Sequence, residues 1–356
     1  MDADGSTPMR VLVTGGAGYI GSVVADELLR SGHEVVVLDN LSHGHRQAVP
    51  KNAELVEGDL ADRAALDDLL RSRAVDAVMH FAALIEAGES MKVPEQFFRN
   101  NTANALTLLE AMLATGVKRF VFSSTAALFG NPDRTPIEED DPVHPTNAYG
   151  ESKLLLERML AWFHRIHGLR YASLRYFNAA GAMRPDQGEA HKPETHLIPR
   201  ILQVPLGRAG HINIFGTDYP TSDGTCVRDY IHVSDLARAH LLALAALENT
   251  APLIYNLGNG QGFSVRQVVE VARKVTGHPI PVVESPRRAG DPAVLIASSA
   301  KIRRELGWQP QYTDLESIVE SAWQWHRSHP DGYAPVDTDH VEKNELDVPK
   351  LAHRDR

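Results

Sequence analysis

The sequence contains a single cysteine, Cys226, so no intramolecular disulfide framework can form. It also lacks any apolar run near the roughly 20 residues that cross a bilayer, and its acidic start, MDADGST, lacks the basic and apolar regions of a signal peptide. Basic residues are the minority, with 36 Lys and Arg against 46 Asp and Glu. These absences disfavour a protein that binds nucleic acid or a membrane surface, and they predict a cytoplasmic protein whose partners are small molecules.

The chain has enough hydrophobic residues to form a full core, since they make up 43% of its 356 residues. Between Arg10 and Asn178 short β-branched runs alternate with longer segments of helical period. This alternation is typical of a parallel sheet with helices on both faces, so the predicted fold class is α/β, a Rossmann-type doubly wound parallel sheet. The predicted strands are RVLVTG, EVVVLDN, AELVEGDL, DAVMHFAA, KRFVFSST and RYASLRYFN.

The clearest predicted helices are VVADELLRSG, the stretch from Pro94 to Gly116, and AYGESKLLLERMLAWFHRIHG. Each ends at a glycine, and the second opens with a proline, which is the usual asymmetry of helix ends. No internal repeat interrupts this pattern.

The pattern changes after Asn178, where glycine, proline and histidine become frequent. We therefore predict a dinucleotide-binding domain over residues 9–178 and a smaller, mixed α/β substrate lobe over residues 179–329, in which HINIFG and PLIYNLG are isolated strands. Residues 226–249 read as a strand leading into a helix, and this unit is a candidate to return to the first domain. Residues 330–356 are polar and aperiodic, which predicts a loose tail.

Three glycines, Gly15, Gly18 and Gly21, stand three apart between the first strand and the first helix. Glycine here permits a tight turn and lets backbone amides approach a pyrophosphate at the helix N-terminus. A glycine triplet alone fits an ordinary turn, but a second strand ends at Asp39, where a carboxylate can bind the adenosine ribose and repel an extra phosphate. This context favours NAD over NADP. Asp59, after the third strand, suits either an adenine contact or a helix N-cap.

Tyr149 and Lys153 are four residues apart at the start of a predicted helix, so their side chains share one face. A phenol has a pKa of about 10, and a nearby ammonium together with an oxidised nicotinamide would lower that pKa so that the phenol can accept a hydroxyl proton. Ser123, Ser124 and Thr125 end a strand at the sheet edge where open sheets bind ligands. An isolated Tyr–Lys pair is as easily a chance contact, but this context makes it a candidate acid–base site.

Taken in order, the motifs resemble those of the UDP-glucose 4-epimerases of the extended short-chain dehydrogenase/reductase family. The resemblance covers residues 10–327, and GTCVRDYIHV is closer to these epimerases than to the group at large. The motifs are VTGGAGYIG, LDN, VEGD, FAA with GES, the pair Asn100 and Asn101, FSST, AYGESK, RYFN, DGTCVRDYIHVSDLA and YNLGNG.

The resemblance implies an enzyme that keeps NAD bound, removes a hydride from carbon 4 of UDP-galactose or UDP-glucose, and returns it to the other face of a 4-keto intermediate. It implies that Tyr149 is the base, that Thr125 assists it through a hydrogen bond to the sugar hydroxyl, and that Lys153 binds the nicotinamide ribose. It also implies a homodimer through the two long helices that start near Pro94 and Ala148. The implied cofactor-binding residues are Gly15, Gly18, Tyr19, Ile20, Gly21, Asp39, Asn40, Asp59, Leu60, Phe81, Ala82, Ala83, Asn100, Ser123, Tyr149, Lys153 and Tyr176.

For the substrate, the resemblance implies that Arg228 and Arg288 hold the diphosphate and that Asp291 binds the uridine ribose. Asn213 and Phe215 would contact the uracil. Taken alone, without the motif, each arginine fits a surface salt bridge better than a diphosphate contact. The full implied substrate set is Thr125, Tyr149, Asn178, His196, Leu197, Asn213, Phe215, Arg228, Tyr230, Arg288, Asp291 and Leu295.

Four positions depart from the family pattern. Ile85 replaces a lysine that contacts the cofactor, His196 replaces an asparagine facing the sugar, and Phe129 replaces the tyrosine of VYG. Leu295 stands at a gate position that is bulky in some members and small in those accepting N-acetyl sugars. Its intermediate size leaves acetamido substrates open.

Other functions remain as alternatives. A sugar-nucleotide 4,6-dehydratase needs an Asp–Glu pair after the threonine, whereas here Ala126 and Ala127 follow Thr125. Sequence separates an epimerase of UDP-N-acetylhexosamine, UDP-glucuronate or UDP-xylose poorly from the hexose enzyme. A dehydrogenase that releases reduced cofactor is a further alternative, and the intact Tyr149, Lys153 and Thr125 speak against a non-catalytic dinucleotide sensor. No metal site is expected, because His43 and His45 have no carboxylate or cysteine at ligand spacing.

Overall fold

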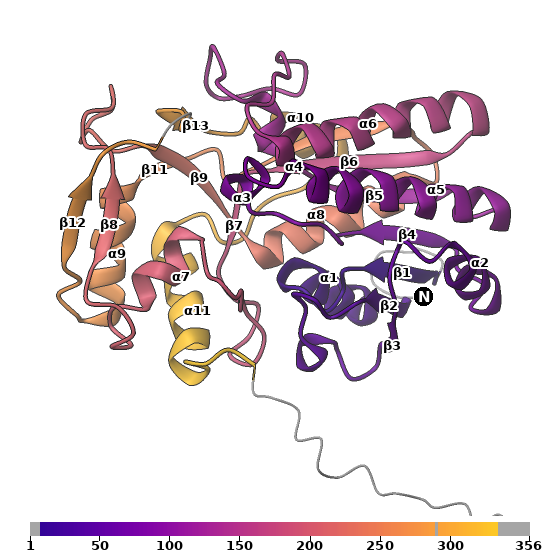
Figure 1. The fold of residues 1–356 in the computed structure, drawn as a ribbon, viewed down its shortest axis with the longest axis horizontal. Coiled ribbons are helices and arrows are strands. Elements are labelled where there is room, and N and C mark those ends of the chain that lie inside the picture. Colours follow the sequence, from indigo (N-terminus) through magenta and orange to yellow (C-terminus); the bar gives the residue numbers. More distant parts are fainter. Residues whose placement is uncertain (1–7, 289–290, 334–356) are drawn as a thin grey trace, which may run out of the picture.

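The largest element is a parallel sheet of seven strands (Figure 1). The computed structural model describes residues 8–288 and 291–333. Neighbouring strands follow the order β10, β6, β5, β4, β1, β2, β3, and every pairing is parallel, which confirms the predicted α/β class. The strands are β1 (Arg10–Thr14), β2 (Glu34–Asp39), β3 (Glu54–Glu57), β4 (Ala77–His80), β5 (Arg119–Thr125), β6 (Arg170–Tyr176) and β10 (Leu253–Leu257).

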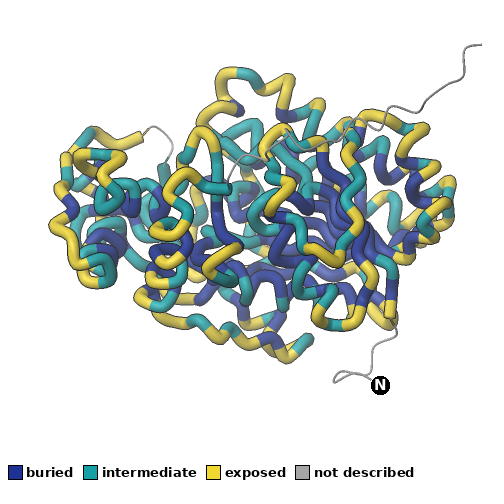
Figure 2. Tube along the Cα trace, turned by 90° about the horizontal axis from the view of Figure 1, so that it is seen from below, coloured by how far each residue is buried: buried dark blue, intermediate teal, exposed yellow. Residues whose placement is uncertain are grey.

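Two hydrophobic layers cover this sheet because its side chains alternate between faces. Val11 and Val13 of β1 join one cluster, and Leu12 between them joins the other. The first layer holds α1 (Tyr19–Arg30) and α8 (Val233–Ala246). The second layer holds α2 (Arg63–Ser72), α5 (Asn104–Thr115) and α6 (Ala148–His167). The sheet therefore forms the buried centre of the molecule (Figure 2).

Helix α6 has the predicted bounds, and both of its ends follow from local chemistry. The side chain of Asn147 accepts a hydrogen bond of 2.8 Å from the backbone N–H of Gly150, which caps the first turn. Gly168 ends the helix in the left-handed conformation, with φ of 68°. This start places Tyr149 and Lys153 in the first two turns, against the carboxyl end of β5.

The predicted helix from Pro94 to Gly116 is wrong as one continuous α-helix. It consists of α4 (Pro94–Phe97), a π-helical segment η2 (Phe98–Ala103) and α5. The interruption is associated with contacts to distant segments. Within η2 the side chain of Asn101 accepts a hydrogen bond of 2.9 Å from the backbone N–H of Leu84 and donates one of 3.1 Å to the hydroxyl of Ser152. A π-helical insertion is common at functional sites, and this one turns Asn100 toward the cavity described below.

The second lobe contains two small sheets and three helices around their own core. In one sheet β9 (Val227–His232) pairs with β7 (Asn178–Ala180), β11 (Gly262–Ser264) and β13 (Val294–Leu295). In the other, β8 (Ile212–Phe215) pairs with β12 (Val282–Ser285). The helices are α7 (Leu197–Leu202), α9 (Val265–Thr276) and α11 (Leu315–Ser328). Shorter elements elsewhere are η1 (Arg46–Ala48), α3 (Ala87–Ser90), η3 (Ala126–Phe129) and α10 (Ala300–Leu306).

The prediction that HINIFG and PLIYNLG are isolated strands is wrong. PLIYNLG contains β10, which pairs in parallel with β6 at the edge of the large sheet, and HINIFG contains β8, which pairs with β12. The exact division into residues 9–178 and 179–329 stays a prediction, although α8 packs against α1 in the large core. Most of the predicted tail, residues 334–356, lies outside the described residues. Among the described helices none is long and apolar enough to cross a membrane.

Candidate active site

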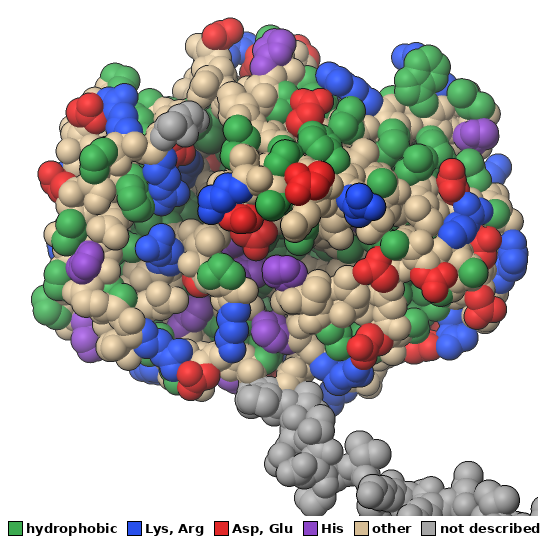
Figure 3. All heavy atoms as spheres, viewed as in Figure 1, with side chains coloured by type: hydrophobic (Ala, Val, Ile, Leu, Met, Phe, Trp, Pro, Cys, Tyr) green, Lys and Arg blue, Asp and Glu red, His purple; other side chains and the backbone are tan. Residues whose placement is uncertain are grey.

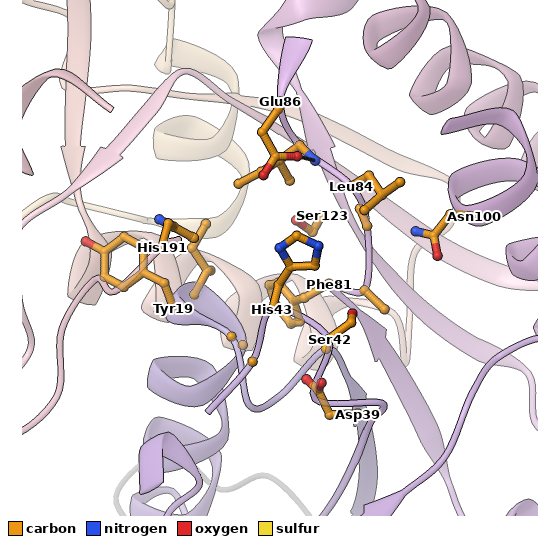
Figure 4. A pocket seen from close by; sticks show the side chains of 18 of the residues that line it. Tyr19, Asp39, Ser42, His43, Phe81, Leu84, Glu86, Asn100, Ser123 and His191 are labelled. Atoms are coloured by element: carbon orange, nitrogen blue, oxygen red, sulfur yellow. Dashed lines mark hydrogen bonds between the residues drawn. The ribbon is translucent and has the colours of Figure 1, made fainter. Parts of the chain in front are cut away.

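A cavity of about 310 Å³ opens at the carboxyl ends of β1, β2, β4 and β5, between the two lobes. Open parallel sheets bind their ligands at this edge. Figure 4 shows Tyr19 and His191 on one side of the cavity and Asn100 on the other. On the outer surface, histidine side chains gather between the lobes (Figure 3).

The glycine turn forms the floor of this central cavity. Gly15 has φ of +71°, and a Cβ atom there would lie 2.5 Å from the backbone nitrogen of Ala82, so only glycine fits. A Cβ on Gly21 would lie 2.3 Å from the carbonyl oxygen of Gly15. Gly18 is less crowded and caps α1, whose first turn has neither a side-chain cap nor an acidic residue. This leaves backbone N–H groups free to bind a phosphate, which is the cradle that a dinucleotide pyrophosphate requires.

Asp39 supports the glycine turn from the end of β2. Its Oδ2 accepts a hydrogen bond of 3.0 Å from the backbone N–H of Ala17, and its Oδ1 accepts one of 2.8 Å from that of Leu41. Although it is only 8% exposed, Asp39 lines the cavity. The carboxylate therefore holds the turn in shape while keeping its negative charge at the position expected to face a ribose.

Asp59 is predicted either to contact the adenine or to cap a helix, and the structure shows that it does not cap α2. Asp62, not Asp59, caps α2, through a hydrogen bond of 3.0 Å from the backbone N–H of Ala65. Asp59 accepts hydrogen bonds of 2.8 Å from the Asn40 side chain and from the backbone of Ala61, and it lines the cavity.

Tyr149 and Thr125 meet at the inner end of the cavity. Burial raises the pKa of the Tyr149 phenol, and a hydrogen bond with Thr125 opposes this rise. The side chain of Lys153 instead donates a hydrogen bond of 3.0 Å to the backbone carbonyl oxygen of Ser123. Burial lowers the pKa of Lys153 to about 7. Burial is the largest cause of the pKa shift at both groups, and Lys153 is not among the causes at Tyr149. That Lys153 together with a bound oxidised nicotinamide lowers the pKa of Tyr149 stays a prediction.

Ser123 joins this group from the end of β5. Its hydroxyl and the Tyr176 phenol share a hydrogen bond of 2.6 Å, and burial raises the pKa of Tyr176. The result is a set of hydroxyl groups facing one end of the cavity. The residues expected to bind cofactor or substrate that line the cavity are Gly15, Gly18, Tyr19, Ile20, Gly21, Asp39, Asn40, Asp59, Leu60, Phe81, Ala82, Ala83, Asn100, Ser123, Thr125, Tyr149, Tyr176, Asn178 and His196.

The expected substrate residues of the second lobe form a separate group on β8, β9, β13 and the loop before β13. The Arg228 guanidinium lies 2.8 Å from the carboxylate of Asp291, and the Arg288 guanidinium lies 4.2 Å from the centre of the Phe215 ring. Asn178 bridges toward this lobe by donating to the backbone oxygen of Asp229 at 2.9 Å. The residues expected to bind cofactor or substrate that do not line the cavity are Lys153 from the first lobe and, from the second lobe, Leu197, Asn213, Phe215, Arg228, Tyr230, Arg288, Asp291 and Leu295.

Sequence reasoning missed part of the cavity wall. Glu86 lines the cavity and raises the pKa of Tyr149, and Glu189 and His191 line its other side. The sequence signal for the last two is the alternation of Glu and His in GEAHKPETH. Nothing in the sequence connects this segment with the glycine turn, because it follows β7, far along the chain. Ile85, which stands where the family has a cofactor-contacting lysine, also lines the cavity. The remaining unexpected lining residues are Leu38, Ser42, His43, Gly44, Gly58, Leu84, Phe177 and Ala179.

The chain matches known proteins over almost their whole length. A UDP-glucose 4-epimerase of Halalkalibacterium halodurans is 52% identical over 333 residues, which cover 93% of this chain and 99% of the relative. The structure of a UDP-glucose 4-epimerase from Brucella ovis in complex with NAD has a TM-score of 0.86 and 45% identity, covering 91% of this chain and 98% of that one.

A third structure, a UDP-glucose 4-epimerase from Bifidobacterium longum in complex with NAD+ and UDP, has a TM-score of 0.86 and 36% identity, covering 91% of this chain and all of that one. Residues 11–258 match the NAD dependent epimerase/dehydratase family, and this segment runs from β1 through β10. The glycine turn, Asp39 and the Tyr149 group all lie within it. The chain therefore belongs to the NAD dependent epimerase/dehydratase family.

Proposed function

We propose that this protein is an NAD-dependent 4-epimerase that interconverts UDP-galactose and UDP-glucose. One observation carries the proposal: Tyr149 and Thr125 line the same cavity as the glycine turn and Asp39, so a proton acceptor faces the site of a dinucleotide. The high identity to UDP-glucose 4-epimerases over nearly the whole chain supports the same activity.

The residues present fit NAD. The uncapped N-terminus of α1 offers backbone donors for the pyrophosphate, and Asp39 offers a carboxylate for the ribose. The buried ammonium of Lys153 adds positive charge beneath the inner end of the cavity. When bound, NAD accepts the hydride from carbon 4 of the sugar and returns it, so the reaction has no net redox change.

Tyr149 has the role of moving the proton. Its phenolate takes the proton of the 4-hydroxyl as the hydride leaves carbon 4, and the phenol gives that proton back when the hydride returns. The hydrogen bond with Thr125 favours the charged form of Tyr149, while burial opposes it. With Ala126 and Ala127 buried or half-buried after Thr125, this stretch offers no acid to expel a neighbouring hydroxyl, which argues against dehydration.

The second lobe would hold the nucleotide. The arginines Arg228 and Arg288 carry the charge that a diphosphate needs, and the Phe215 ring offers a flat surface to a base. A firm grip on the uridine diphosphate leaves the sugar free to present either face after oxidation. On this proposal the residues that bind the nucleotide and the residues that transfer the proton have separate roles, which fits their positions on different lobes.

The experiment is a conversion assay with purified protein and no added nucleotide. Incubation with UDP-galactose should yield UDP-glucose, separated by anion-exchange chromatography, because resident NAD suffices for each cycle. Parallel incubations with UDP-N-acetylgalactosamine, UDP-glucuronate and UDP-xylose test whether Leu295 and His196 admit other sugars. Conversion of one of these alone would replace the hexose substrate, and accumulation of reduced cofactor would point to a dehydrogenase instead.

We also propose a homodimer through α5 and α6. Trp162 and Ile166 on the last turns of α6 are 60% and 67% exposed, which is unusual for large apolar side chains on a helix without a partner. Light scattering on the purified protein measures the mass directly. The double variant W162S/I166S should shift it toward a monomer, and a monomeric wild type would overturn the proposal.

A further inference from the structure

Four side chains from the loop between β7 and α7 meet in the wall of the central cavity. They are two carboxylates and two imidazoles, from Glu189, His191, Glu194 and His196, and one ligand atom of each lies within 4.8 Å of all the others. The proton and hydride transfer proposed above does not use Glu189, Glu194 or His191. The group, here called the Glu–His cluster, therefore needs its own explanation.

The distances within the Glu–His cluster suit a shared metal ion. The Nδ1 atom of His191 lies 3.1 Å from Oε1 of Glu189 and 3.6 Å from Oε2 of Glu194. The Nδ1 atom of His196 lies 2.9 Å and 3.0 Å from Oε1 atoms of the same two glutamates. Bonds of about 2.0–2.1 Å to a tetrahedral Zn²⁺ hold ligand atoms roughly 3.3–3.4 Å apart. Three of these distances are shorter than that value and one is longer, they involve both oxygens of Glu194, and the four ligand atoms lie within 4.8 Å of one another, so the side chains would adjust to close around an ion.

The direction of one ring nitrogen supports a shared centre over simple pairing. The buried Nδ1 atom of His191 makes no hydrogen bond, although Oε1 of Glu189 is 3.1 Å away. The ring therefore does not aim this nitrogen at that oxygen. This nitrogen therefore lies near both carboxylates without a hydrogen bond to either, whereas Nδ1 of His196 is hydrogen-bonded to Glu194 at 3.0 Å. A metal ion between the two carboxylates would give the His191 nitrogen a partner.

The cluster is also held firmly from behind. Trp325 of α11 donates a hydrogen bond of 2.9 Å to the backbone oxygen of Glu189. The same ring packs so closely on Gly188 that a Cβ there would lie 2.4 Å from it. Glu189 is thus fixed in place and 96% buried, a costly position for a carboxylate without a compensating charge. Within the cluster, one dication bound by two carboxylates and two neutral imidazoles gives a net charge of zero, and two protonated imidazoles would give the same balance without an ion.

We propose that the Glu–His cluster binds one Zn²⁺ ion per chain as a structural site. Two imidazoles and two carboxylates are ligands that Zn²⁺ accepts, and four protein ligands close the coordination shell as in structural sites. The ion would tie Glu189 and His191 to the start of α7 at His196, and so fix the loop that faces the glycine turn. This site differs from the acid–base group of Tyr149, so it stands whether or not the proposed epimerase activity is correct.

The test measures Zn²⁺ binding by the full-length protein, independently of activity. Protein freed of metal by dialysis against dipicolinate is titrated with Zn²⁺ in competition with a chromophoric chelator, and with Co²⁺, whose visible absorption reports tetrahedral coordination. One equivalent should bind, and Co²⁺ should give tetrahedral bands. His191→Asn and Glu194→Gln should each weaken binding at least tenfold and remove the bands.

The matched control is His211→Asn, because His211 is an exposed histidine outside the cluster. It should bind Zn²⁺ as the wild type does. Circular dichroism checks the fold of each variant, and Glu194→Gln carries the test if His191→Asn does not fold. Equal Zn²⁺ affinity in the wild type and both cluster variants would overturn the proposal. So would an absence of stoichiometric binding by the wild type, which would leave the cluster as protonated ion pairs.

Discussion

The Lys153 ammonium donates a hydrogen bond of 3.0 Å to the backbone carbonyl oxygen of Ser123, from a side chain in a residue that is only 3% exposed. Burial lowers the pKa of Lys153 to about 7, whereas in an unfolded chain a lysine has a pKa of about 10.4. Between these values the unfolded chain binds more protons than the folded protein. The contribution of Lys153 to the free energy of unfolding therefore rises with pH across this window.

Lys153→Met should make the protein more stable than the wild type near pH 7, because it removes a buried charge. The advantage should shrink as pH rises toward 10, by at most about 1.4 kcal/mol per pH unit, because the folded lysine is then neutral and the cost of deprotonating it falls as the pH approaches the pKa of the unfolded chain. Thermal melts from pH 7 to 9.5 measure the difference. Lys118→Met, at an exposed lysine, is the control and should show no such trend. A difference that stays constant with pH would contradict the lowered pKa.

Tyr149→Phe should lower turnover by about 10²–10⁴-fold, because it removes the group that accepts the hydroxyl proton. The phenyl ring keeps the shape of the cavity, so the amount of NAD that copurifies should not change. Steady-state kinetics with UDP-galactose and absorbance of released cofactor measure the two effects. Tyr312→Phe, outside the cavity lining, is the control. Turnover near that of the wild type would remove Tyr149 from this role.

The parts of the site that sequence predicted well are those whose chemistry is local. The glycine turn and α6 depend on residues close in the chain: a strand, glycines and a helix in one case, and Asn147 and Gly168 as caps in the other. Such signals are complete within one segment of sequence. The strands of the large sheet were predicted for the same reason, because burial on both faces makes them continuously apolar.

What sequence did not predict depends on contacts between distant segments. Leu253–Leu257 pairs with Arg170–Tyr176, and a short apolar run contains no information about which edge it will join. The π-helical segment exists because Asn101 bonds to Leu84 and Ser152, neither of which is near it in sequence. The Glu–His cluster matches no known zinc-ligand spacing, and its four side chains meet only because the loop folds back on itself.

Gly15→Ala tests whether the glycine turn needs space as well as a left-handed backbone. Gly116→Ala is the matched control, because Gly116 also has a positive φ, of +80°, but a Cβ there meets nothing within 4 Å. Both variants pay about 1–2 kcal/mol for the backbone conformation. Only in Gly15→Ala does the new Cβ also press on the backbone of Ala82, so only this variant should purify without NAD. Equal NAD content in the two variants would show that the close contact does not matter.

Arg288→Met tests the proposed grip of the second lobe on the diphosphate. Its neighbour Arg287 is the control, because Arg287 pairs with Asp218 at 2.6 Å on the surface, while Arg288 lies over the Phe215 ring. A hydrogen bond to a charged group contributes about 1.5–3 kcal/mol, so Arg288→Met should raise KM for UDP-galactose by about 10–150-fold. The amount of bound NAD should stay unchanged, because the proposed NAD site lies in the other lobe. Arg287→Met should leave KM within about twofold of the wild type, as expected for an exposed ion pair. If the two variants raise KM equally, a general loss of positive charge, and not a specific contact from Arg288, explains the effect.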